Sequence, residues 1–84
     1  MIGDPQWLRL SELWQPWAKH HADIVGKLPA VCQYHLWLAT CGHDVPEDLK
    51  PRARVDFLDG KFCEVMPSYN EALAKLKGES DGKL

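Results

Sequence analysis

The stretch that most constrains the fold is Pro29–Cys41, PAVCQYHLWLATC, which is apolar or aromatic nearly throughout. On a helical wheel, Gln33 and Thr40 fall together in one narrow polar strip, and hydrophobic side chains cover most of the remaining surface. A helix that is apolar nearly all round belongs inside a protein, and this one is too short for a bilayer, which requires roughly 20 residues. The sequence therefore predicts a buried central helix on which the other segments pack.

The size and charge of the chain limit its possible functions. Its 84 residues predict one small domain, residues 1–78, followed by a flexible polar tail at 79–84. The net charge of −2 disfavours nucleic acid as a partner, because phosphate binding requires clustered Lys and Arg. No run reaches membrane-spanning length and the start lacks a signal-peptide pattern, so we expect a cytoplasmic protein that does not enter a membrane. The three cysteines, an odd number, suit reduced thiols rather than a disulfide scaffold.

The N-terminal part shows helix signals from its first residues. Asp4 followed by Pro5 is typical of an N-cap and a first helical residue. Pro16 interrupts the pattern, because proline lacks a backbone N–H and clashes with the preceding turn. We expect either one kinked helix or two helices, and favour a first helix ending near Trp14 and a second ending at Gly26. Hydrophobic side chains recur here at helical spacing: Trp7, Leu10, Leu13, Trp14, Trp17, His21, Ile24 and Val25.

The segment Arg52–Met66 is predicted to form a β-hairpin, because its first half alternates polar and apolar residues and an Asp-Gly pair ends at Gly60. A two-residue turn would pair Val55 with Glu64 and place a charge on the apolar face. A type I turn with Gly60 in a left-handed bulge position pairs Val55 with Cys63 instead. We favour the bulged register because it separates the two faces.

The last predicted element is a helix after a capping box, Ser68 to Glu71, which ends at Gly78. Together these elements predict an α+β fold: an N-terminal bundle of two or three helices, one antiparallel β-hairpin and one C-terminal helix.

Four side chains of metal-binding type lie close in sequence: Cys32, His35, Cys41 and His43. Their spacing matches none of the usual zinc signatures, and Cys41 projects about 180° away from the Cys32 side of a helix. A core-facing histidine with a hydrogen-bond partner and a packed cysteine are the simpler interpretation. Zinc remains a third alternative, and we expect no metal and no cofactor.

Catalysis by a Cys–His pair, such as Cys32 with His35, lacks the local loops that would support it, and Cys63 is expected to be buried and inert. We therefore predict no catalytic residue and no enzymatic activity.

A helix–turn–helix DNA-binding regulator is the second candidate function, because a helix, a short turn with Gly26 and a second helix follow one another. The second helix, Pro29–Cys41, contains no Lys or Arg, whereas phosphate contacts require positive charge. DNA binding is therefore disfavoured.

The first candidate is a small non-catalytic module that binds another protein and regulates or inhibits it. Tryptophan and tyrosine are favoured interface anchors, and this chain has four Trp and two Tyr. We expect Trp7 to be the exposed anchor, with Trp17 as a second possibility. The partner is another protein or a second copy of the chain in a homo-oligomer.

Overall fold

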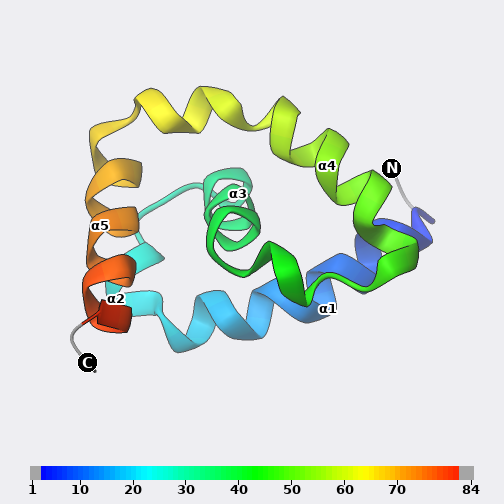
Figure 1. The fold of residues 1–84 in the computed structure, drawn as a ribbon, viewed down its shortest axis with the longest axis horizontal. Coiled ribbons are helices and arrows are strands. Elements are labelled where there is room, and N and C mark those ends of the chain that lie inside the picture. The colour runs from blue at the N-terminus through cyan, green and yellow to red at the C-terminus, as the bar shows by residue number, and fades with distance from the viewer. Residues whose placement is uncertain (1–2, 82–84) are drawn as a thin grey trace.

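The computed structural model describes residues 3–81, with side chains through residue 78. Helices make up this part of the chain and no strand occurs within it. One helix, α3, occupies the centre, and the other elements surround it (Figure 1). No helix among the described residues is both long and apolar enough to cross a bilayer. In chain order the elements are α1 (Pro5–His20), α2 (Ala22–Val25), α3 (Ala30–Cys41), η1 (Gly42–Asp44), η2 (Glu47–Leu49), α4 (Lys50–Asp59), η3 (Lys61–Val65) and α5 (Pro67–Asp81), where η marks a 3₁₀ helix.

The prediction of a buried central helix is confirmed by α3, with Pro29 as its N-cap. The two side chains of the predicted polar strip bond to backbone carbonyls: Gln33 Nε2 donates to Leu28 O at 2.9 Å, and Thr40 Oγ1 donates to Leu36 O at 2.9 Å. These bonds satisfy polar atoms beside the core, where an unpaired group would be costly. The buried residues of α3 are Cys32, Tyr34, His35, Leu36, Trp37 and Leu38.

The start of α1 is confirmed, because Asp4 is the N-cap and its Oδ1 accepts a hydrogen bond from Trp7 N at 3.1 Å. The favoured break near Trp14 is wrong: α1 continues through Pro16 to His20. Proline forgoes a backbone hydrogen bond inside a helix. Burial of Leu10, Trp14 and Ala18 against α3 offsets that loss and keeps the helix continuous.

The predicted β-hairpin is wrong, and with it the α+β class: the described residues form an all-α fold. The segment is helical instead, with α4 followed directly by η3. Period-two alternation was too short to exclude a helix, and a helical stripe competes with it. That stripe places Leu49, Ala53 and Phe57 four residues apart, on the side that packs on α3. Val55, which was expected to face Cys63, is exposed, whereas Cys63 is buried.

Gly60 ends α4 and makes no hairpin turn. Its N–H donates to Asp56 O at 3.0 Å, and its φ of −93° is right-handed, so the predicted left-handed bulge is absent. Glycine is required here by close packing: a Cβ at this position would lie 2.8 Å from His35 Nδ1. The Asp-Gly pair therefore ends a helix in this chain, and the glycine is required because the His35 ring packs against it.

The C-terminal helix is confirmed, but it begins at Pro67, so Ser68 lies within its first turn and is not the predicted N-cap. It also passes Gly78 and continues to Asp81. Its docking against η3 and α2 supports a helix there. The flexibility expected at 79–84 stays a prediction, and residues 82–84 lie outside the described part.

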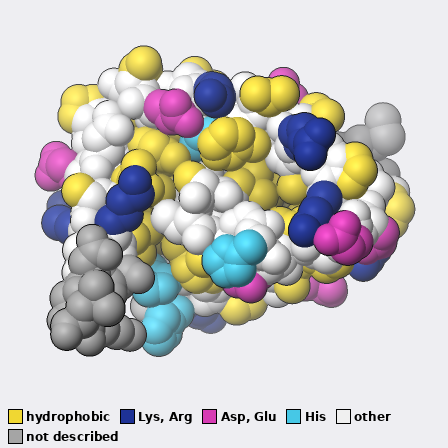
Figure 2. Space-filling view, in the orientation of Figure 1, with side chains coloured by type: hydrophobic (Ala, Val, Ile, Leu, Met, Phe, Trp, Pro, Cys, Tyr) yellow, Lys and Arg dark blue, Asp and Glu magenta, His cyan; other side chains and the backbone are white. Residues whose placement is uncertain are grey.

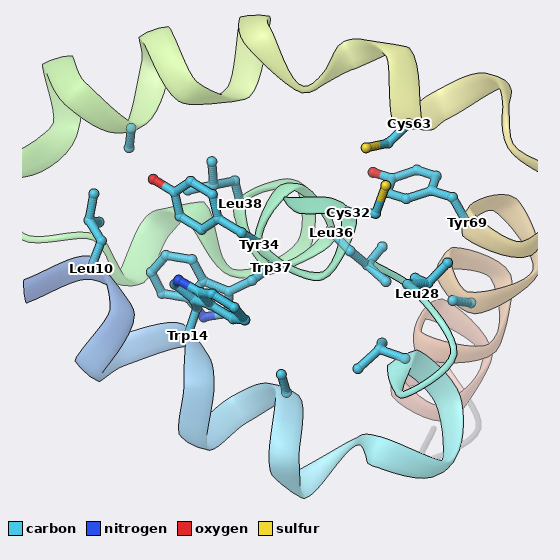
Figure 3. Close-up of a cluster of buried hydrophobic side chains, with 14 of the residues drawn as sticks. Leu10, Trp14, Leu28, Cys32, Tyr34, Leu36, Trp37, Leu38, Cys63 and Tyr69 are labelled. Carbon is cyan, nitrogen blue, oxygen red and sulfur yellow. The ribbon is translucent and has the colours of Figure 1, made fainter. Parts of the chain in front are cut away.

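The core divides into two regions on opposite sides of α3 (Figure 3). The aromatic cluster lies between α1 and α3 and consists of Trp7, Trp14, Tyr34 and Trp37. The His35 cluster lies between α3, α4, η3 and α5 and consists of Cys32, His35, Phe57, Cys63 and Tyr69.

Candidate protein-binding surface

The two tryptophans predicted as anchors are both half-buried, and they lie in different environments. The Trp7 indole packs at the edge of the aromatic cluster, 5.1 Å from the Tyr34 ring with the planes at 88°. The Trp17 indole packs instead on His21, with a ring-centre distance of 5.1 Å. The structure therefore does not bring the two together, and Trp7 belongs to a recognisable surface feature whereas Trp17 lies beside a histidine.

That feature is an open pocket of about 250 Å³ between α1, α3 and α4. Aromatic and aliphatic side chains form its walls, and carboxylates lie at its α4 side. The pocket is lined by Trp7, Ala30, Val31, Tyr34, Asp56 and Asp59, together with Gly60. We call it the Trp7 pocket.

A chain of charged hydrogen bonds holds the wall of the Trp7 pocket. Tyr34 OH donates to Asp56 Oδ2 at 2.7 Å, and Arg52 Nε donates to the same carboxylate at 3.0 Å. Arg52 also donates through Nη1 to Asp4 Oδ2 at 2.8 Å, which joins the start of α1 to α4. Burial raises the pKa of the Tyr34 hydroxyl, and the hydrogen bond to Asp56 raises it further. The phenol is therefore neutral and its ring is held in one orientation.

The same network affects Asp4. The hydrogen bond from Trp7 N, followed by that from Arg52, lowers the pKa of the Asp4 carboxyl below its ordinary value of 3.8. Asp4 therefore carries a full negative charge at neutral pH, where it both caps α1 and binds Arg52.

Beside this pocket, α4 and η3 run along one edge of the molecule (Figure 1), and together they carry a set of exposed apolar side chains. Its members are spaced three, four and three residues apart and are all well exposed, Val65 reaching 81%. We call this set the α4–η3 stripe: Val55, Leu58, Phe62 and Val65. Exposed apolar side chains that recur along two successive elements of a small protein indicate a contact surface more than isolated exposed residues do.

The α4–η3 stripe was missed in the sequence because its residues were assigned to strands. Their 3–4–3 spacing is compatible with one face of a helix, and the structure divides the four residues between α4 and the 3₁₀ helix η3. The hydrogen bond from Tyr34 to Asp56 joins residues 22 positions apart and has no local sequence signal.

The four candidate zinc ligands do not converge. His35 is buried with Nε2 3.2 Å from Glu64 Oε2, and the Cys32 thiol contacts Met66 Sδ at 3.6 Å. His43 is exposed and lies 3.5 Å from Asp44. Among the described residues, no three His, Cys, Asp or Glu side chains are grouped so that they could hold a metal ion.

The candidate nucleophile Cys63 is buried as expected. Burial, followed by the neighbouring Cys32 thiol, raises the pKa of Cys63 to about 12. A thiol with such a pKa is protonated at neutral pH and is a poor nucleophile.

The helix–turn–helix alternative would require α3 to enter a DNA groove. Most of α3 is instead buried, and its exposed positions are Ala30, Val31 and Ala39. These side chains carry no group that could bond to a base edge or a phosphate. The position of α3 in the fold therefore argues against its use as a recognition helix.

Comparison with protein-family models, curated proteins and solved structures finds no match to this chain.

Proposed function

We propose that this protein is a small non-catalytic module that binds another protein through the α4–η3 stripe and regulates or inhibits it. The observation that carries the proposal is the exposure of four large apolar side chains on the successive elements α4 and η3. When a partner covers exposed apolar area of this kind, its removal from water favours binding by about 25 cal/mol per Å².

The charges around the stripe favour a protein partner over a nucleic acid. Arg54 and Lys61 alternate along the chain with Asp59 and Glu64, so the two signs are mixed over the same elements. Figure 2 shows basic and acidic side chains interspersed with hydrophobic ones along the α4 edge. A nucleic-acid surface would instead concentrate positive charge. A polar rim of mixed sign around an apolar centre is the usual anatomy of a protein interface.

The cysteines suit a reducing compartment, which agrees with the cytoplasmic location we propose. All three thiols are free, and Cys32 and Cys63 are buried within the core. Reduced thiols persist in the cytosol, whereas secreted domains of this size depend on disulfides.

Charge insertion into the stripe tests the proposal. We expect Leu58→Glu and Phe62→Glu to weaken partner binding at least tenfold, because central apolar anchors contribute about 2 kcal/mol or more each. Isotope-labelled affinity capture from host lysate gives the partner and the relative binding of each variant. Sedimentation equilibrium shows whether the partner is a second copy of the chain.

Leu8→Glu is the matched control, because Leu8 on α1 is 58% exposed, close to the 60% of Leu58. It should bind as the unmodified protein does. Equal loss from Leu8→Glu, or full binding by both stripe variants with native circular dichroism, would contradict the proposed surface.

A further inference from the structure

We infer that the Trp7 pocket binds an arginine side chain of the partner protein. The inference rests on the proposed function, because the pocket lies next to the α4–η3 stripe and would be covered by the same partner. Asp59 and Gly60 line the pocket and directly follow Leu58 of the stripe at the end of α4. Phe62, also of the stripe, lies two residues after Gly60.

The walls of the pocket suit a flat cation. Trp7 is half-buried and provides the accessible aromatic surface of the pocket, whereas Tyr34 is only 4% exposed and supports the indole from the core side in an edge-to-face contact at 5.1 Å. A cation near an aromatic face is attracted by the ring quadrupole, and the planar guanidinium of arginine also stacks on such a face. Ala30 and Val31 add apolar surface against which the methylene groups of the arginine can pack.

The charges at the pocket favour a positive ligand. Asp59 is exposed, and within the part of the chain that the structure describes no Lys, Arg or His side chain forms a salt bridge with it. Asp56 is already engaged by Arg52 and by the Tyr34 hydroxyl. Among the residues that line the pocket, two carry a carboxylate and none carries a positively charged group. A carboxylate can accept two parallel hydrogen bonds from an arginine, which a lysine cannot provide.

The size and rigidity of the pocket agree with a single side chain. Its volume of about 250 Å³ is below the range of roughly 300–1,000 Å³ typical of pockets for whole small-molecule ligands. The Tyr34 hydroxyl is fixed on Asp56 and the Trp7 backbone is fixed by the Asp4 cap. A wall ordered before binding loses little conformational entropy when the ligand enters.

The test needs no identified partner, since the side chain can be supplied alone. Nα-acetyl-L-arginine N-methylamide is titrated into ¹⁵N-labelled protein at constant ionic strength, and the Trp7 indole N–H signal is followed. That signal is assigned by its loss in Trp7→Phe. The matched uncharged probe is Nα-acetyl-L-citrulline N-methylamide, and the lysine analogue separates a guanidinium from an ammonium.

We expect saturable shifts of the Trp7 signal with a millimolar dissociation constant for the arginine probe and about tenfold weaker binding of the citrulline probe, because cation–π attraction and the ion pair are both lost. Asp59→Asn should weaken arginine binding about threefold to fivefold, as expected for an exposed ion pair. Asp23→Asn on α2 is the matched control and should bind as the unmodified protein does.

Equal binding of the arginine and citrulline probes, stronger binding of the lysine probe, or no effect of Asp59→Asn would overturn the inference. Its failure is distinguishable from failure of the proposed function, because the stripe variants report on partner binding without any probe. Loss of partner binding by Phe62→Glu together with an unresponsive Trp7 signal would leave the stripe in place and remove the arginine site.

Discussion

The aromatic cluster and the His35 cluster pack on opposite sides of α3 (Figure 3). The polar atoms of the two clusters have different hydrogen-bond partners. The Tyr34 hydroxyl leads out of the aromatic cluster to Asp56 and Arg52 at the surface. His35 is 1% exposed, with Nε2 at Glu64 and with Nδ1 lacking a partner in the described structure. Both sides of the core thus reach a surface carboxylate, but Tyr34 joins a network of two carboxylates and one guanidinium, whereas His35 is next to the Glu64 carboxylate.

Burial keeps two groups of the His35 cluster, Tyr69 and Cys63, neutral. Burial, and then the Glu64 charge, raise the pKa of Tyr69 to about 12, and burial raises that of Cys63 to about 12. Both groups are protonated at neutral pH. The difference between the clusters teaches where recognition can occur on this fold, since a side chain that binds a partner must reach the surface, as Trp7 does.

The largest expected effect tests the packing of the aromatic cluster. Trp14 is 4% exposed, so Trp14→Ala should lower the free energy of unfolding by about 3–5 kcal/mol. Trp17→Ala, the same change at a half-buried site outside the cluster, should cost about 1–2 kcal/mol. Urea denaturation followed by circular dichroism measures both. Equal losses would show that the cluster is not the better-packed site.

A smaller effect tests how tightly the side chains of the His35 cluster are packed. Gly60→Ala would place a Cβ 2.8 Å from His35 Nδ1, and the imidazole is stacked on Phe57 at 4.4 Å. Displacing that ring should cost about 2 kcal/mol. Gly78→Ala is the control, because no atom lies within 4 Å of the added carbon, and it should stabilise α5 by about 0.5–1 kcal/mol. No change in the free energy of unfolding for Gly60→Ala would mean that the His35 ring moves aside easily, which would contradict tight packing of this cluster.

The smallest effect compares the two tyrosines directly. Tyr34→Phe removes a 2.7 Å hydrogen bond to a carboxylate and should cost about 1.5 kcal/mol. The Tyr69 hydroxyl lies instead toward the sulfur atoms of Cys32 and Cys63 (Figure 3), which are weak hydrogen-bonding groups. Tyr69→Phe should therefore change the free energy of unfolding by less than about 0.5 kcal/mol. A larger loss for Tyr69→Phe in thermal and urea denaturation would reverse the comparison.

Local chemistry explains which elements could be predicted. The start of α1 follows from one residue pair, because Asp4 caps the helix and Pro5 has no N–H to leave unpaired. The position of α3 follows from its apolar composition between Pro29 and Gly42. Trp7 was predicted as a surface anchor from its place near the chain start, and the structure brings it to a pocket wall; whether it binds a partner stays a prediction.

Where two local patterns competed, the prediction was wrong. In residues 52–66, alternation and an Asp-Gly pair resemble a hairpin, while Leu49, Ala53 and Phe57 form a helical stripe. The stripe prevails because a hairpin alone is marginal in water, whereas a helix can pack on α3. Pro16 shows the same competition, since tertiary burial of Trp14 and Ala18 keeps α1 intact.

The sequence by itself determined the buried helix, the Asp4 cap of α1 and the supply of aromatic side chains, because these depend on neighbours within a few residues. Tertiary structure alone decided that residues 50–65 are helical, that Val55, Leu58, Phe62 and Val65 face outward, and that Tyr34 and Asp56 meet beside Trp7. These outcomes depend on which surfaces α3 offers to segments far away in the chain. Where two local patterns compete, burial against α3 contributes the free energy that decides between them.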